Sequence, residues 1–108
     1  MYWVSIGGME MKGWGVFVPT VWRTMRALKA ARSAQGCVHA EVFRRGRTYF
    51  ALSVWERRAA MQAYARGKVH GTMMALAPVT MRMFRNESYE AAMVPDKASA
   101  MAKWDAKA

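Results

Sequence analysis

Two neighbouring runs of β-branched and aromatic residues constrain the fold of this chain most strongly. They cover residues 37–44 and 48–55, and Arg45-Gly46-Arg47 separates them. A short polar connection containing glycine between two such runs is typical of a β-hairpin. The sequence therefore predicts two adjacent antiparallel strands in the middle of the chain.

The segments on either side of the hairpin predict the remaining elements. Before it, residues 2–7 alternate like a strand, and residues 19–33 carry the apolar spacing of an amphipathic helix. After it, residues 56–78 are helical in pattern with an interruption at Gly67, and residues 79–85 alternate again. The order β-α-β-β-α-β predicts a ferredoxin-like α+β domain, in which two helices cover one face of a four-stranded antiparallel sheet.

The end of the chain predicts a short extension of that domain. We expect residues 1–87 to form the ferredoxin-like domain and residues 88–108 to form a C-terminal extension. Ser88 is a candidate helix N-cap, Pro95 marks a break, and a short helix is expected around residues 98–104. A chain of 108 residues has the length of one domain with a modest core.

Strand parity divides the side chains of the predicted sheet between two faces. An aliphatic set is suited to packing against the helices: Val4, Ile6, Val38, Ala40, Val42, Phe50, Leu52, Val54, Val79, Met81 and Met83. The opposite set is aromatic and polar: Trp3, Ser5, His39, Glu41, Phe43, Tyr49, Ala51, Ser53, Trp55, Thr80, Arg82 and Phe84. Because so much aromatic surface is costly in water, we expect the second face to meet the sheet of a second copy, in a homodimer, or a flat aromatic partner.

The composition is basic and rich in apolar residues. Seventeen Lys and Arg against seven Asp and Glu give a net charge of +10, a field that attracts nucleic acid, anionic lipid or acidic ligands without choosing among them. A hydrophobic content of 54%, with 11 Met and 5 Trp, favours an oligomer or a hydrophobic pocket.

The same composition narrows the class of protein. No apolar run approaches the roughly 20 residues that span a bilayer, so no membrane span and a cytoplasmic location are expected. Cys37 is the only cysteine, which excludes an internal disulfide and a cysteine-based metal cluster. The sequence has no glycine-rich phosphate loop and no flavin fingerprint.

Two stretches in the second half carry a family resemblance. Residues 50–56, followed by a helix with Tyr64 and then Val69-His70-Gly71, resemble the antibiotic-biosynthesis monooxygenase group. The last residues, around Trp104, are similar to the tail of the spheroidene monooxygenase family. The resemblance implies a dimeric α+β barrel, in which ferredoxin-like subunits pair through their sheets and each subunit has a pocket between sheet and helices.

The resemblance also implies a class of function. Members of the group oxygenate aromatic or polyene substrates or cleave haem, some without a cofactor, and others only bind small ligands. The expected function is a small monooxygenase-like protein that binds a planar hydrophobic ligand or haem, with a non-catalytic dimeric ligand-binding domain as an alternative. Trp55 and His70 match the site residues of the haem-degrading branch, while Ser5 stands where that branch has an asparagine.

His70 is the central candidate for chemistry. A neutral imidazole can ligate haem iron or take a proton from a phenol-like substrate. Met73 and Met74 follow along the same helix and are candidates for a pocket wall, and Lys68 is a candidate to hold a carboxylate or propionate. Trp22 and Tyr64 are candidates, with Trp55, for the walls of a planar-ligand pocket or for the core.

A second group of candidates lies on the predicted strands. His39 and Glu41 are two residues apart on one strand face, and Arg82 is expected on the same face of another strand. Such a trio fits either an acid/base pair with an anion anchor, in which His39 is catalytic and Arg82 binds the ligand, or an ion pair at a dimer seam.

A nucleic-acid-binding class competes with these interpretations. RNA-recognition domains share the β-α-β-β-α-β order and place aromatic rings on an open sheet face. Residues 45–52 partly resemble their third-strand motif, although Arg47 stands where a stacking ring is expected, and Trp3 is a candidate ring on the first strand. The charge favours this class, whereas the weak motif and His70 favour the monooxygenase-like one.

Overall fold

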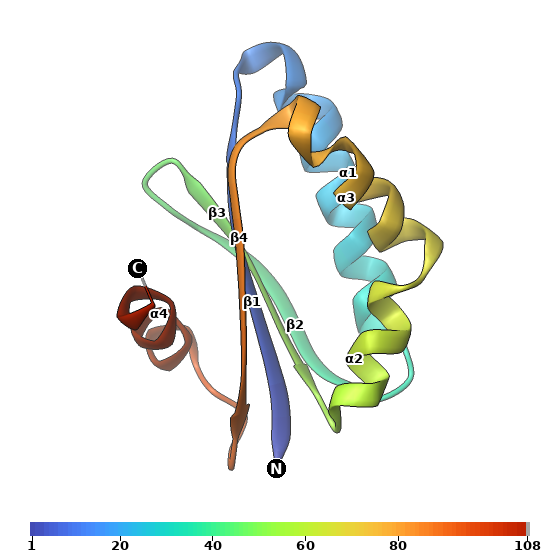
Figure 1. Ribbon diagram of the computed structural model, residues 1–108, viewed down its shortest axis with the longest axis vertical. Helices are drawn as coiled ribbons and strands as arrows, with labels where there is room; N and C mark the ends of the chain where they lie inside the picture. The colour runs from blue at the N-terminus through green and yellow to red at the C-terminus, as the bar shows by residue number, and fades with distance from the viewer. Residues whose placement is uncertain (108) are drawn as a thin grey trace.

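The chain folds as a four-stranded antiparallel sheet with helices on both faces (Figure 1). A computed structural model describes residues 1–107, and the side chains of these residues other than Trp14 and Val79. The elements in chain order are β1 (Tyr2–Met11), α1 (Trp14–Ser33), β2 (Cys37–Arg45), β3 (Thr48–Trp55), α2 (Arg58–Ala65), α3 (Lys68–Thr80), β4 (Met81–Ala91) and α4 (Lys97–Ala106). The strand order β2-β3-β1-β4 confirms the ferredoxin-like α+β fold.

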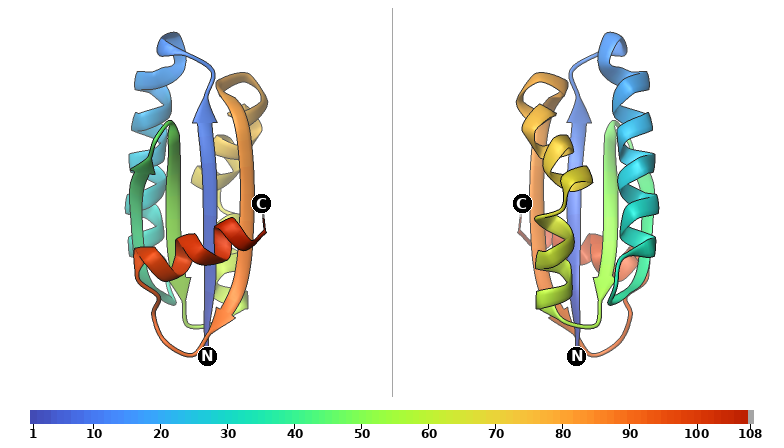
Figure 2. Two further views of the ribbon diagram at one scale, coloured as in Figure 1. Left: turned by 90° about the vertical axis from the view of Figure 1, so that its left-hand side faces the viewer. Right: turned by 90° about the vertical axis from the view of Figure 1, so that its right-hand side faces the viewer.

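The helices form two layers around the sheet. Helices α1, α2 and α3 cover one face, and α4 crosses the opposite face (Figures 1 and 2). The predicted second helix is therefore two helices, α2 and α3, which separate at Gly67, where the backbone is extended before α3 begins. Within the described residues, none of the helices has the length and apolar character needed to cross a membrane.

The central hairpin forms as predicted. The register places Arg45 opposite Thr48, so Gly46 and Arg47 make the turn between β2 and β3. Gly46 has φ +62°, in the left-handed region that glycine adopts without a steric penalty. The turn residue that predicted the hairpin is thus the one whose backbone makes it possible.

Strand β1 is longer than predicted because its two glycines lie inside it. The strand continues to Met11 instead of ending at Gly7-Gly8. A Cβ atom at Gly8 would lie 2.5 Å from the ring of Trp104 in α4, so the missing side chain makes room for that ring. These glycines therefore allow close packing rather than a turn.

Helix α1 also begins earlier than predicted, and a different face of it is buried. It begins at Trp14, and Pro19 lies inside its first two turns. Small residues face the sheet: Thr20, Thr24, Ala27 and Ala31. Trp22 and Met25 belong to the apolar spacing that predicted this helix, and the expectation that they face the sheet was wrong, because they are 60% and 50% exposed. Large rings such as Trp55, 5.3 Å from that of Tyr64, pack beneath the C-terminal half of the helix and leave room there for small side chains such as Ala31.

Strand β4 extends past the expected domain boundary. It runs to Ala91, and Ser88 pairs with Ser5 of β1, so the expected N-cap at Ser88 was wrong. The N-cap of α4 is Asp96, whose Oδ1 accepts a 2.8 Å hydrogen bond from the backbone N–H of Ser99. The expected extension ends at Ala108, which lies outside the described residues.

The two faces of β1 and β3 are occupied in the opposite way from the one expected. The aliphatic residues pack beneath α4 with Ala100 and Trp104: Val4, Ile6, Phe50, Leu52 and Val54. On the other face, Trp3 and Trp55 lie beneath α1 and α2. The residues of β2 were grouped with the wrong parity, because the register sets Phe43 opposite Phe50 and turns Ala40 toward the helices. The expected side-chain position of Val79 lies outside the described residues.

Trp104 anchors α4 on the sheet. Its ring is 5% exposed and meets the Phe50 ring edge-on, with the centroids 5.1 Å apart. The guanidinium of Arg85 lies over the indole, 3.6 Å from its centroid, and donates a hydrogen bond to the Trp104 carbonyl. The two hydrogen bonds from Arg45 to Asp105 join exposed groups and contribute less.

We expect Trp104→Ala to lower the free energy of unfolding by roughly 3–5 kcal/mol, because it removes a buried ring that completes one core. Urea unfolding followed by circular dichroism measures the change. Trp22→Ala is the matched control, since the same side chain is 60% exposed there and the expected loss is below about 1 kcal/mol. Equal losses in both variants would contradict the docking of α4.

Candidate functional site

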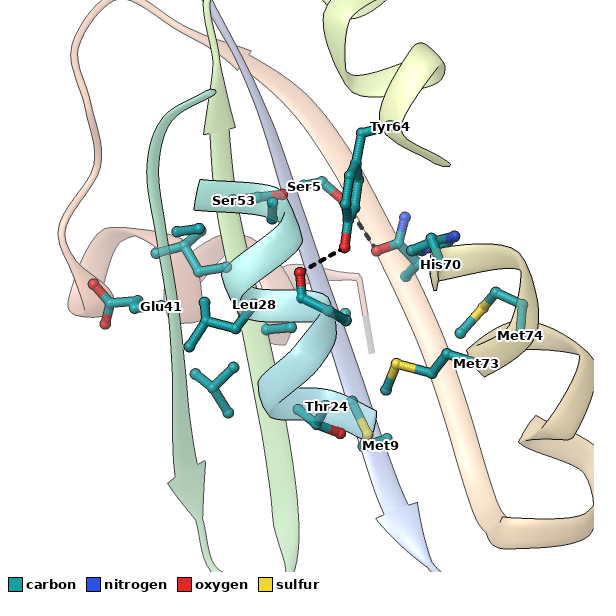
Figure 3. Close-up of a pocket in the computed structure, with 18 of the residues that line it drawn as sticks. Ser5, Met9, Thr24, Leu28, Glu41, Ser53, Tyr64, His70, Met73 and Met74 are labelled. Carbon is teal, nitrogen blue, oxygen red and sulfur yellow. Dashed lines mark hydrogen bonds between the residues drawn. The ribbon is translucent and has the colours of Figure 1, made fainter. Parts of the chain in front are cut away.

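A cavity of about 110 Å³ lies between the sheet and the helices α1, α2 and α3 (Figure 3). Most of its wall is apolar, with three methionines, Met9, Met73 and Met74, among the lining residues. Polar residues also line it: Ser5, Thr24, Ser53, Tyr64, His70, Asn86, and Glu41, whose carboxylate points away from the cavity. Such a mixture of apolar wall and few polar groups is characteristic of small-molecule sites.

The cavity exists because the floor beneath it carries small side chains. The register of β1 and β3 places Ser5 opposite Ser53 and Gly7 opposite Ala51. Larger pairs bound this patch, with Trp3 opposite Trp55 at one end and Met9 opposite Tyr49 at the other. Since cross-strand partners point to the same face, four small residues lie together between two rows of large ones.

His70 stands on the wall formed by α3. Its ring meets that of Tyr64 edge-on, with the centroids 5.5 Å apart. Burial lowers the pKa of His70 below its ordinary value, and a hydrogen bond to the backbone of Ala65 only partly opposes this effect. The imidazole is therefore neutral near pH 7 and can accept a proton.

Tyr64 is a fixed part of the wall. Its hydroxyl donates a 2.9 Å hydrogen bond to the backbone carbonyl of Ala27, which ties α2 to α1. Burial raises the pKa of Tyr64, so the phenol stays protonated and keeps this bond. The ring that His70 contacts is thus held in place.

Two polar groups remain available to a ligand. Ser5 Oγ donates to Asn86 Oδ1 over 3.1 Å, which leaves the NH2 group of the Asn86 amide as a donor at the exposed rim. Thr24 is 6% exposed, and its Oγ1 has no hydrogen-bond partner among the described residues. A buried hydroxyl without a partner is costly, and a polar atom of a ligand would satisfy it.

Comparison with known proteins places the fold. No family model and no curated protein matches the sequence. Solved structures match most of the chain. A protein of unknown function from Nitrosomonas europaea has a TM-score of 0.72 at 21% identity, over 88% of this chain and 95% of that one. The cofactor-independent oxygenase SnoaB from Streptomyces nogalater has a TM-score of 0.71 at 12% identity, over 88% of this chain and 98% of that one. A putative antibiotic biosynthesis monooxygenase from Deinococcus radiodurans has a TM-score of 0.76 at 13% identity, over 87% of this chain and 96% of that one.

The chain has the antibiotic-biosynthesis monooxygenase fold. The resemblance stated from the residues around Trp55 and His70 is thereby confirmed at the level of the fold. Identities this low carry the architecture and leave the activity to be argued from the site. The similarity of the tail to the spheroidene monooxygenase family stays a prediction.

Within this monooxygenase-like fold, four of the expected site residues meet at the cavity: Tyr64, His70, Met73 and Met74. Trp55 lies behind Tyr64 as a fully buried core residue and does not line the cavity. Trp22 is exposed on the outer side of α1, where its ring contacts Arg26. The sequence interpretation missed Asn86 because it ended the fourth strand at residue 85, whereas β4 runs to Ala91.

The expected trio of His39, Glu41 and Arg82 does not assemble. His39 hydrogen-bonds Glu41 on the face that α4 crosses, and Figure 3 shows the Glu41 carboxylate turned away from the cavity. Arg82 pairs with Glu10 over 3.3 Å. It cannot join the other two because β4 and β2 form opposite edges of the sheet. Lys68 lines a separate hollow between α1 and α3.

The cavity does not fit haem in its present shape. A cavity of roughly 150 Å³ holds one benzene ring, so about 110 Å³ admits part of a small ligand and not a macrocycle of four pyrrole rings. In the part of the chain that the structure describes, no group of three or more His, Cys, Asp or Glu side chains could hold a metal ion. The residues present favour an organic ligand with one flat ring.

The burial of His70 predicts a pH-dependent stability. Between its lowered pKa in the folded chain and about 6.5 in the unfolded chain, the unfolded state binds more protons, so the free energy of unfolding falls as the pH falls through this window. We expect His70→Gln to show a smaller decrease between pH 8 and pH 5 than the unchanged chain. The midpoints of urea unfolding across this range measure the decrease. The reference is pH 8, at which the His70 imidazole is neutral in both the folded and the unfolded chain. An identical decrease in both proteins would show that His70 is not buried.

Proposed function

We propose that this chain is a cofactor-free monooxygenase whose cavity takes one flat ring of a small hydrophobic substrate. The observation that carries the proposal is a small, mostly apolar cavity, bordered by the exposed Asn86, with the neutral imidazole of His70 on its wall. The fold, which this chain shares with a cofactor-independent oxygenase, adds support. Haem stays a less favoured ligand because of the size of the cavity.

The chemistry needs a base and a site that excludes water. His70 would take a proton from an acidic C–H or O–H of the substrate, and the resulting anion would transfer electrons to dioxygen. For an activated CH2 group, one oxygen atom enters to give C=O and the other leaves as water with the two hydrogens. The oxidation of the carbon by four electrons balances the reduction of dioxygen.

Polar groups around the cavity would orient the substrate. The Thr24 hydroxyl and the Asn86 amide can each hydrogen-bond an oxygen atom of the ligand. Holding the ring in one orientation keeps the reacting atom near His70 and lowers the entropic part of the barrier. The methionines supply an apolar wall that adapts to the ligand.

A nucleic-acid-binding function has less support from the described side chains. Trp3, Tyr49 and Trp55 lie on the face that the helices cover, so they form no open stacking platform. On the other face, α4 covers Phe50, and the Phe43 ring stacks on it. The positive charge therefore needs another explanation than an aromatic platform for bases.

Anthrone, which carries an acidic CH2 between two aromatic rings, is a suitable test substrate if one outer ring enters the cavity and the remaining rings lie at its exposed rim. We expect the protein to accelerate its oxidation to anthraquinone, with one dioxygen consumed for each product. His70→Ala should lower kcat/KM by roughly 10²-fold or more, the usual contribution of a positioned base. An oxygen electrode and the absorbance of anthraquinone provide independent readouts.

The chain offers a matched control for this experiment. His39→Ala removes the other histidine, which lies on the opposite face of the sheet, and should leave the rate unchanged. No acceleration, or equal losses in both variants, would leave a non-catalytic ligand-binding domain as the function of this fold.

We also infer that two copies pair through the face that α4 crosses. Partly buried apolar side chains lie beside α4 on that face, among them Phe43, Met83 and Tyr89. A second copy would remove the rest of this surface from water, as the resemblance to dimeric α+β barrels implies.

Light scattering tests the pairing. We expect a mass of two chains for the unchanged protein and of one chain for Met83→Glu, because a carboxylate would enter the apolar contact. Phe84→Glu is the control, since the neighbouring residue of β4 points to the opposite face and is 41% exposed. A monomer at every concentration, or dissociation by both variants, would refute pairing through this face.

A further inference from the structure

A second hollow, of about 330 Å³, lies between α1 and α3. Its lining residues are Arg23, Arg26, Lys68, Val69, Thr72 and Met73. Every ionisable side chain among them is a cation. The hollow therefore combines a positive rim with an apolar floor, a composition that suits an anionic group attached to a hydrophobic body.

This hollow adjoins the cavity through one side chain. Met73 lines both, so its thioether forms part of the boundary between them. Figure 3 shows Met73 reaching from α3 toward the cavity beside Met74. Met73 is buried in one cluster with Ala27 of α1, so a molecule could extend from the cavity into the hollow only if this side chain moved. A methionine has three flexible torsions and adapts to a neighbouring ligand.

The cations of the hollow have no anionic partner in the described part of the chain. Arg23 is partly buried, and among the described residues neither a hydrogen bond nor an ion pair engages its side chain. The Lys68 side chain has no such partner there either, but it is exposed. The Arg26 guanidinium lies 4.9 Å from the centre of the Trp22 ring and meets no carboxylate. Partial burial of a cation without a counter-charge is unfavourable, and three like charges around one hollow add repulsion. A bound anion would relieve both costs.

We propose that the substrate is an aromatic acid, with its ring in the cavity and its carboxylate held by Arg23, Arg26 and Lys68 in the adjoining hollow. The inference rests on the proposed function of the cavity and names the class of substrate. The hollow alone has a volume within the range of about 300–1,000 Å³ that is usual for ligand sites, and the cavity adds a mostly apolar space for the ring. Guanidinium groups match the planar carboxylate geometry.

The other basic hollow of the molecule serves as a comparison. It lies at the hairpin end, where its cations are Lys12, Arg44, Arg47 and Arg82. Glu10 lies within it and pairs with Arg82, so its charge is partly neutralised. It shares no lining residue with the cavity. Its arginines therefore provide control substitutions of equal charge.

Binding of 2-naphthoate and 2-naphthamide tests the proposal, because the two probes share a ring system and differ in charge. Isothermal titration calorimetry should give a roughly tenfold lower Kd for the carboxylate, the ratio that corresponds to about 1.4 kcal/mol. The double variant Arg23→Gln/Lys68→Gln should remove this preference and leave the affinity for the amide unchanged. Arg44→Gln/Arg47→Gln removes the same charge at the hairpin and should retain the preference.

Filling the cavity separates this inference from the proposed function. Ala51→Leu places a larger side chain on the floor of the cavity, and Met74→Trp places a larger side chain on its wall. Circular dichroism identifies which of the two variants remains folded. We expect both probes to lose affinity in the folded variant. Unchanged affinity for the amide would overturn the cavity as the ring site, and the proposed function with it.

Other results would overturn the acid specificity alone. Equal affinities for the two probes, or a preference that survives Arg23→Gln/Lys68→Gln, would mean that the hollow does not recognise a carboxylate. Competition by inorganic phosphate against naphthoate but not against naphthamide is expected, because phosphate alone should occupy only the hollow. A further outcome concerns the place of the ring. Loss of naphthoate binding in Arg23→Gln/Lys68→Gln but not in the cavity-filling variant would show that the ring stays outside the cavity.

Discussion

The pairing of β1 with β3 is the constraint on which the rest of the structure depends. Its register sets Val4 opposite Val54 and Ile6 opposite Leu52 on one face, and small residues such as Gly7 opposite Ala51 on the other. The first face is dry and aliphatic and accepts α4, whereas the second leaves a space beneath the helices. A slip by one residue would exchange the faces, abolish the cavity and place Trp104 against polar side chains. Docking of α4 and formation of the site are therefore two consequences of one register.

Local sequence signals predicted the helices and strands. The face on which each strand residue lies, and the contacts between distant residues, depend on the register of the sheet, which the sequence did not reveal. The hairpin followed from Gly46, whose backbone conformation is required by the turn, and His70, Met73 and Met74 followed from helical spacing. The faces of β1 were not predictable in this way, because Trp3 and Val4 are both apolar and both faces are covered. Asn86 and Ser5 come together across 81 positions of sequence, so only the pairing of β1 with β4 could reveal them.

The structure shows which basic side chains are paired with carboxylates and which are not. Three arginines have a carboxylate partner: Arg45 with Asp105, Arg82 with Glu10, and Arg85 with Glu87. With seven acidic residues for seventeen basic ones, most cations must lack such a partner. The partly buried Arg23 is the informative case, because water screens an exposed cation but only incompletely compensates one on the wall of a hollow. The charge of Arg23 is therefore the part of the net charge that the proposed ligand would use, whereas the exposed cations are solvated by water.

The small size of the cavity and the chemistry proposed for it have a common physical cause. Burial beside Tyr64 lowers the pKa of His70, which keeps the imidazole neutral and able to accept a proton. A wider and wetter site would admit a larger ligand but would solvate the imidazolium and raise that pKa again. The methionine wall suits such a site, because the flexible side chains of Met73 and Met74 can adapt to the shape of a ligand while they keep the wall apolar. A small resting cavity is thus what a base in an apolar site requires, and the adjoining basic hollow can hold the charged part of a substrate without wetting the reacting part.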